Sequence, residues 1–430
     1  MGKRLIAVLA LALIVGLTFG AAYAEVQNVK VSGDINVLGI TRSNFDLGYG
    51  PVNSNDQNLF ATQTRIRVDA DLTDNVMATV RLINERNWSA ETVATTDIDL
   101  DLAYVTLKEF LYSPLTLTVG RQELRFGNAL IVGNGNQLAN GAAALNGLPR
   151  DLTSRKAFDA LRATLNYDPL IVDAVYAKVS DVNTNLSDDI DLYGINASYD
   201  ISKKLNVQAY VWNKKDKSTV LADSKKDDVT TIGALVSGSP IENLKTSLEA
   251  ALQTGHNRRN NEAAAKQHRG FAIQGLADYT FAKTKYTPNL GVGYTYLSGN
   301  SKKVSGWDAM FTDQRLNSIV YAILPYTNMT VYNVKGSVKP VEDVTLSANY
   351  GYYQLNKSVA TITSASTGTA MAINTSKKNL GSEIDLTATY DYTEDVQLGL
   401  TGGAFWKGTA FAGSKGDTAT QLIGSMKVVF

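Results

Sequence analysis

Arginine and carboxylate side chains recur at alternate positions in several short segments of this 430-residue chain. The arginines of interest are Arg65, Arg67, Arg81, Arg121, Arg125 and Arg162, and the acids are Asp97, Asp99, Asp101, Glu123 and Glu249. A guanidinium holds a carboxylate through two parallel hydrogen bonds, so these residues can bind anionic solutes or pair with one another. Residues two apart share one face of a strand. The chemistry therefore depends on which segments are strands.

The chain offers little for catalysis or metal binding. It has no Cys and only two His, His256 and His268, which excludes a thiolate zinc site and a cysteine nucleophile. Both histidines fall in a predicted loop at 255–268, away from any serine on a strand, which argues against a serine hydrolase. We expect no enzyme, no catalytic residue, no metal and no other cofactor. Lys+Arg and Asp+Glu are both 41, a balance that excludes a polybasic partner of nucleic acid.

The N-terminus contains the three parts of a secretory signal peptide in order. Lys3 and Arg4 are basic, residues 5–19 are apolar and uncharged, and Ala22-Tyr23-Ala24 places small residues where a signal peptidase cleaves. The apolar stretch is too short for a membrane-spanning helix, which needs about 20 residues. We expect a signal peptide at 1–24 and one mature domain at 25–430.

Apolar and polar residues alternate along most of the remaining chain. Between residues 60 and 72, Phe60, Ile66 and Val68 occupy even positions, whereas Arg65 and Arg67 occupy odd ones. A period of two indicates a strand with one apolar and one polar face. The pattern predicts eighteen strands, near 29–42, 58–72, 76–86, 97–109, 115–126, 157–167, 170–180, 190–200, 204–213, 228–239, 243–254, 269–281, 289–298, 327–339, 343–356, 380–392, 395–407 and 418–430.

The connections between the predicted strands alternate in length. Tight turns occur near 72–76, 112–114, 167–169, 239–241 and 392–395, and long connections at 43–57, 127–156, 255–268, 299–326 and 357–379. Short turns at one end and long loops at the other are typical of outer-membrane barrels. We predict an all-β, transmembrane, antiparallel up-and-down barrel of about eighteen strands with periplasmic turns and extracellular loops, surrounded by outer-membrane lipid and lipopolysaccharide.

The last predicted strand ends the chain on an aromatic residue. Leu422, Met426, Val428 and Phe430 share one face of it. This arrangement is similar to the terminal motif that barrel assembly machinery recognises, so we expect that machinery as a partner through Phe430. A barrel of this size leaves a water-filled lumen, which predicts a channel.

Four segments resemble one family of outer-membrane porins. They are Asp101-Leu102-Ala103-Tyr104-Val105, the run 118–127 (TVGRQELRFG), the run 155–162 (RKAFDALR) and the run 290–300 (LGVGYTYLSGN). Together they are similar to the alginate-export porins. The resemblance implies an eighteen-stranded monomeric barrel whose arginine-lined lumen passes an anionic polyuronate.

The strand phase places the charged residues. The apolar face of 115–126 is odd up to Val119 and even from Leu124, so we predict a β-bulge near Gly120. The inward side chains are then Arg65, Arg67, Arg81, Arg121, Arg125, Arg162, Asp97, Asp99, Asp101 and Glu123, with Glu249 across the barrel.

Two interpretations of these charges remain open. One is a belt of guanidiniums that binds carboxylates along a conduction path. The other is a wall of ion pairs between neighbouring strands, which suits Arg81, Glu123 and the three aspartates equally well. We expect Arg65, Arg67, Arg125 and Arg162 to face the pore. The loop 127–156 either folds into the lumen or lies at the surface.

We therefore expect a channel that passively passes small or polymeric anionic solutes. The alternatives are a general diffusion porin of low selectivity and a barrel that serves as a surface anchor or adhesin. A surface anchor does not require charged side chains in the lumen. A belt of arginines in the lumen would therefore favour a channel over an anchor.

Overall fold

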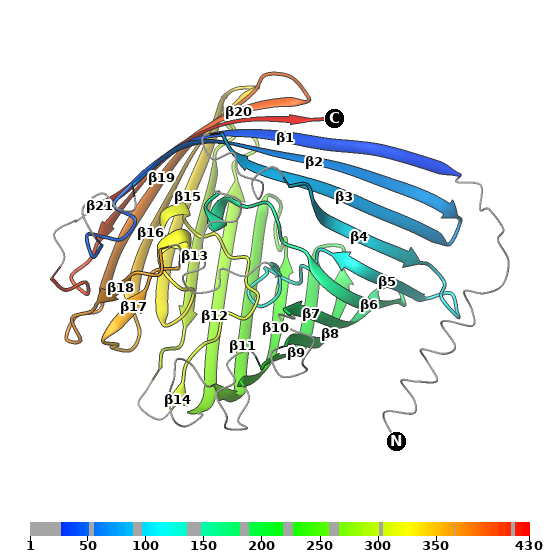
Figure 1. Cartoon of the computed structure of the whole chain (residues 1–430), viewed down its shortest axis with the longest axis horizontal. Coiled ribbons are helices and arrows are strands. Elements are labelled where there is room, and N and C mark those ends of the chain that lie inside the picture. Colours follow the sequence, from blue (N-terminus) through cyan, green and yellow to red (C-terminus); the bar gives the residue numbers. More distant parts are fainter. Residues whose placement is uncertain are drawn as a thin grey trace.

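A computed structural model describes residues 27–50, 56–88, 97–135, 148–180, 189–217, 227–257, 266–300, 304–365, 367–413 and 418–430. Eighteen antiparallel strands in these ranges close into a barrel, which confirms the predicted fold (Figure 1). The predicted signal peptide lies outside the described residues. The barrel strands are β1 (Asn28–Ser43), β2 (Gln57–Thr73), β3 (Val76–Asn87), β4 (Asp99–Leu107), β5 (Leu115–Gln122), β6 (Phe158–Asn166), β7 (Leu170–Ser180), β8 (Ile190–Ser202), β9 (Leu205–Asp216), β10 (Asp227–Gly238), β11 (Leu244–Asn257), β12 (Lys266–Thr280), β13 (Asn289–Leu297), β15 (Met329–Val341), β16 (Val344–Leu355), β19 (Asn379–Asp391), β20 (Val396–Lys407) and β21 (Thr418–Val429).

Each barrel strand pairs with the barrel strands before and after it in the chain. β14 (Val304–Ser305) and the hairpin of β17 (Thr361–Thr363) and β18 (Ala370–Ala372) lie in the long connections. β1 pairs with β21 from Asp34↔Val429 to Ser43↔Thr420, which closes the ring. Among the barrel strands that the structure describes, closure leaves no open sheet edge toward lipid. No helix among the described residues is long and apolar enough to cross a membrane.

Side-chain alternation separates an apolar outside from a polar inside. On β3, Val80 and Leu82 are exposed on the outer face, whereas Thr79 and Glu85 are buried on the inner face. The outer apolar side chains would contact lipid, and the inner polar ones need hydrogen-bond partners inside the barrel.

Two strands extend into the predicted loop 255–268. β11 continues to Asn257 and β12 begins at Lys266, so His256 and His268 lie on paired strands. The prediction was wrong here because a polar sequence at a barrel rim still forms ladder hydrogen bonds. His268 is fully buried, and its Nε2 lies 3.0 Å from Gln253 Oε1.

The predicted bulge near Gly120 is also wrong. β5 pairs with β4 and β6 without a register shift, and the shift lies instead between Arg81 and Leu82, opposite Asp101. The apolar phase changes because the chain leaves the sheet after Gln122, so Leu124 no longer follows a strand period.

Gly120 nevertheless has a backbone that favours glycine. Its φ is +122°, and a Cβ there would lie 2.2 Å from the carbonyl oxygen of Ala103. We expect Gly120→Ala to destabilise the barrel by about 1–3 kcal/mol, measured as a lower urea midpoint of unfolding. Gly424→Ala is the control, because a Cβ there meets nothing within 4 Å. Equal midpoints for the two variants would contradict the prediction.

Segments from the long connections fold into the barrel. The bridge Val132↔Phe311 joins the β5–β6 connection to the β14–β15 connection, which carries the helix α2 (Ser318–Ile323). Leu130, Ile131 and Val132 are buried, so the described part of loop 127–156 folds inward. The yellow α2 lies inside the ring of strands (Figure 1). Residues 130–132 and the buried side chains of α2 share one apolar core with the inner faces of the strands.

Candidate functional site: the arginine wall and the inner segments

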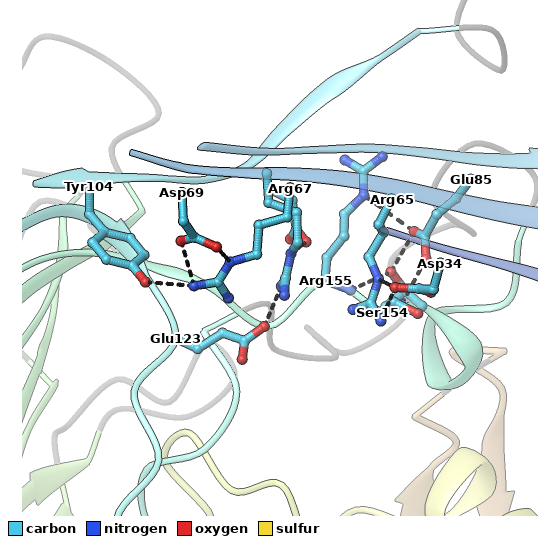
Figure 2. Close-up of polar contacts among 12 residues, drawn as sticks. Asp34, Arg65, Arg67, Asp69, Glu85, Tyr104, Glu123, Ser154 and Arg155 are labelled. Atoms are coloured by element: carbon cyan, nitrogen blue, oxygen red, sulfur yellow. Dashed lines mark hydrogen bonds and ion pairs between the residues drawn. The ribbon is translucent and has the colours of Figure 1, made fainter. Parts of the chain in front are cut away.

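Arginines on β2, β3 and β6 form the inner wall of one side of the barrel. We call Arg65, Arg67, Arg81 and Arg162 the arginine wall. Arg65 Nη2 lies 2.8 Å from Asp34 Oδ1, and Arg67 Nε lies 2.7 Å from Asp69 Oδ2 (Figure 2). Both pairs use acids on the same or the adjacent strand, as the ion-pair interpretation expects.

Arg81 is the most enclosed member of the arginine wall. Its Nε donates to Asp101 Oδ2 at 2.6 Å, and its Nη2 pairs with Glu123, which lies just beyond the end of β5. Its side chain is 11% exposed. The register shift at Asp101 turns both Asp101 and Leu102 inward, which brings this carboxylate beneath the guanidinium.

Arg162 connects the wall to the inner segments. Its Nε donates to Asp173 Oδ1 at 2.7 Å, and its guanidinium carbon lies 5.3 Å from the centre of the Phe126 ring. Phe126 belongs to the chain that has left β5 and entered the barrel. A cation over an aromatic ring is attracted to the face of that ring. Arg162 therefore helps to hold the inner segment against β6.

Arg125 and Lys156 converge on one carboxylate. Arg125 Nη1 lies 2.8 Å and Lys156 Nζ 2.5 Å from the same Oδ2 of Asp313. The Asp313 side chain is buried, whereas that of Arg125 is 56% exposed. The three charges join both limbs of the β5–β6 connection to the β14–β15 connection. Two cations share one acid, so this cluster carries a net positive charge.

The limb that returns to β6, residues 148–157, is held by buried ion pairs. It includes the short 3₁₀ helix η2 (Arg150–Leu152). Arg42 donates from Nη1 and Nη2 to the two oxygens of Asp151 at 3.1 and 2.5 Å, and these side chains are 1% and 3% exposed. Glu85 accepts hydrogen bonds from Ser154 N at 2.7 Å and Arg155 Nε at 3.2 Å (Figure 2).

Two carboxylates on β19 hold α2. Glu383 accepts hydrogen bonds from the backbone N–H groups of Ile319 at 2.6 Å and Val320 at 2.7 Å, and it is fully buried. Asp385 accepts from Ser318 N at 3.1 Å and Ser318 Oγ at 2.6 Å. The first N–H groups of a helix have no partner within the helix, so these acids fix the orientation of α2.

Three residues predicted from the sequence, Arg121, Asp97 and Glu249, lie apart from the arginine wall and from the ion pairs of the limb 148–157. Arg121 pairs with Asp159 at 3.0 Å on the same face as Val119 and Leu161, which is the outer face, so its predicted inward placement is wrong. The reason is the missing bulge: without it, Arg121 keeps the phase of Val119.

Asp97 is exposed at the start of the segment before β4, where its backbone carbonyl accepts a hydrogen bond from Asn84. Glu249 is buried beneath Gly127 and accepts a hydrogen bond from Tyr210 Oη at 2.8 Å. Asp99, by contrast, pairs with the limb 148–157, because its Oδ2 lies 2.5 Å from Arg155 Nη2.

The sequence did not identify Arg42, Glu85, Arg155, Asp313 and Glu383. Glu85 shares the inward phase of Arg81, a signal that could have found it. The partners of the others come from distant connections, and no local pattern predicts those contacts.

A closed barrel with a polar interior and inner segments defines an outer-membrane channel for solutes. Residues 29–425 match the family described as alginate export. The chain belongs to the alginate export family. No curated protein is significantly similar to it in sequence.

Solved structures with a similar fold include channels of two bacteria. OccK8 (OprE) of Pseudomonas aeruginosa is 13% identical, with a TM-score of 0.57 over 94% of this chain and 99% of that one. OccK2 (OpdF) of the same species, solved in complex with glucuronate, is 11% identical, with a TM-score of 0.56 over 94% and 99%. OccAB2 of Acinetobacter baumannii is 11% identical, with a TM-score of 0.56 over 95% and 99%. At these identities the likeness shows the fold alone.

Proposed function

We propose that this channel passively passes solutes that carry carboxylates, with small organic anions or polyuronates as the substrate class. The observation that carries the proposal is the cluster of Arg125, Lys156 and Asp313. It joins the two inner connections, it has a net positive charge, and the side chain of Arg125 is more than half exposed.

The arginine wall supplies further donors along the same path. A guanidinium has five N–H groups, and Arg67 and Arg162 each direct only some of theirs to an acid. A passing carboxylate can therefore form transient hydrogen bonds without displacing the wall pairs. Ion pairing and solute binding are compatible roles for the same residues. Glucuronate, the ligand of OccK2, belongs to the proposed substrate class.

The second candidate is a general diffusion porin of low selectivity. The pairing of every arginine in the wall with an acid favours it, because paired charges produce a weak field at a distance. The two candidates differ in the sign and size of ion selectivity.

The test is the reversal potential of the purified barrel in a planar bilayer under a salt gradient. We expect anion preference, and we expect the triple variant Arg67→Gln, Arg125→Gln, Arg162→Gln to shift the reversal potential toward cations. Arg121→Gln is the matched control, since it removes one guanidinium from the outer face. A wild-type channel without anion preference would support the diffusion porin. An unchanged reversal potential in the triple variant would indicate that these arginines serve only in structural ion pairs.

The same proposal includes the route to the membrane. Cleavage after Ala24 would release a mature chain that starts at Glu25, and barrel assembly machinery would recognise the terminal strand. Phe430 pairs with Gly33 through both backbone hydrogen bonds, and its ring is exposed where the barrel closes. Mass measurement of the purified protein tests the cleavage. Truncation of Phe430 tests assembly through the yield of folded barrel.

A further inference from the structure

The outer face of the barrel carries an open hollow of about 790 Å³ across β13 to β21. One row of paired residues crosses it in register from β13 to β21: Leu290, Gly336, Ala348, Leu386, Gly402 and Leu422. Three small residues in this row, Gly336, Ala348 and Gly402, lie between the leucines. The hollow exists because glycine and alanine leave space that the leucines border.

The small residues of the hollow are open to the outside. A Cβ on Gly402 would lie 3.8 Å from the nearest atom, Leu422 Cδ1, and one on Gly336 would lie 3.6 Å from the Asn289 carbonyl oxygen. These are ordinary contacts, so strand packing does not require glycine at either position. The bordering leucines are exposed: Leu386 and Leu422 are each at least half accessible. The hollow is thus an apolar trough in the part of the barrel that faces lipid.

One end of the trough meets a basic turn. Phe281 and Pro288 line that end, and they flank the turn between β12 and β13. Lys283 and Lys285 are exposed in this turn. Lys339, also exposed, donates its backbone N–H to the carbonyl of Tyr286 at 2.8 Å, which places it beside the same turn.

The position of the basic turn selects a leaflet. The turn lies at the same end of the barrel as the short connections, the start of β1 and the end of β21. This end is the periplasmic one in this class of protein. Glu342 and Asp343 occupy the next turn, between β15 and β16, whereas the three lysines lie in or beside the turn that borders the trough. The apolar trough is suited to contact with an acyl chain, and the lysines are suited to pairing with a phosphate group.

We propose that this trough is a binding site for an anionic phospholipid of the inner leaflet, with one acyl chain along the trough and the phosphate at Lys283, Lys285 and Lys339. Basic groups at the end of an apolar membrane surface are a known arrangement for anionic head groups. A second barrel packed against the leucines would cover the trough but bring no phosphate to the lysines.

The experiment measures lipid retained on the full barrel by native mass spectrometry after exchange into equal amounts of phosphatidylglycerol and phosphatidylcholine. We expect several-fold more phosphatidylglycerol to remain bound. The variant Lys283→Gln, Lys285→Gln, Lys339→Gln should lose this preference. Gly402→Leu, which fills the trough, should lower the retention of both lipids. The matched control Lys203→Gln, Lys204→Gln removes charge from the turn between β8 and β9 and should leave retention unchanged.

Four outcomes would overturn the proposal. Equal retention of the two lipids would contradict a head-group site at the lysines. Retention that neither the lysine variant nor Gly402→Leu changes would contradict a lipid site in the trough. A stable dimer that Gly402→Leu dissociates would assign the trough to a second copy. Displacement of phosphatidylglycerol by lipopolysaccharide alone, without an effect of the lysine variant, would assign it to the outer leaflet. Far-UV circular dichroism and single-channel conductance confirm that each variant folds, and neither readout depends on lipid preference.

Discussion

The double variant Glu383→Ala, Asp385→Ala is expected to raise the single-channel conductance several-fold. The two carboxylates accept the first backbone N–H groups of α2, and the helix lies inside the barrel against β19, β20 and β21. Leaving a buried N–H without a partner costs about 1–3 kcal/mol. Loss of three such hydrogen bonds favours displacement of α2 out of the lumen, which widens the water-filled path.

Single and control variants make this prediction specific. Glu383→Gln keeps an acceptor oxygen in place, so we expect a smaller increase in conductance. Glu394→Gln changes an exposed acid in the turn between β19 and β20 and should leave conductance unchanged. Conductance recorded in planar bilayers is the measurement. A double variant that folds normally by circular dichroism and conducts like the wild type would show that α2 does not limit the path.

The variant Asp151→Ala is expected to destabilise the limb 148–157 by about 3–5 kcal/mol, because it leaves Arg42 as an unpaired buried charge. Both side chains are almost fully buried, and Asp151 accepts two hydrogen bonds from this guanidinium. The measurement is amide hydrogen exchange of Leu152 and Thr153, whose N–H groups bond to carbonyls within the limb. Exchange should become much faster in the variant.

A compensating variant separates pairing from packing. Replacing both partners, as in Arg42→Met with Asp151→Leu, removes the uncompensated charge and should restore most of the protection. Asp97→Ala changes an exposed acid and should have no effect. If Asp151→Ala exchanged like the wild type, the limb would be held by Glu85 and the apolar contacts of Leu148 instead.

The two predictions concern linked parts of one network. Arg42 also donates to Gln421 Oε1 at 2.7 Å, and Gln421 donates to Ser318 Oγ at 3.2 Å. Ser318 begins α2 and is held by Asp385. The effects of substitutions at Asp151 and Asp385 on hydrogen exchange are therefore expected to be non-additive. Residues that share a hydrogen-bond network commonly show such non-additivity.

The sequence by itself determined the barrel. Period-two alternation in segments such as 60–72 reflects a local property, because each side chain of a strand faces either lipid or the interior. Turn residues and connection length are equally local. For this reason the strand number, the antiparallel order and the inward phase of Arg65, Arg67 and Arg81 could be predicted.

Only the tertiary structure decided what the inward charges contact. Arg125 pairs with Asp313 and Arg42 with Asp151, and neither partner is near in sequence. Such contacts depend on how the long connections fold inside the barrel, which has no periodic signal. The side of Arg121 was mispredicted for the same reason, since the phase change after Gly120 arose from a chain that leaves the sheet and enters the lumen.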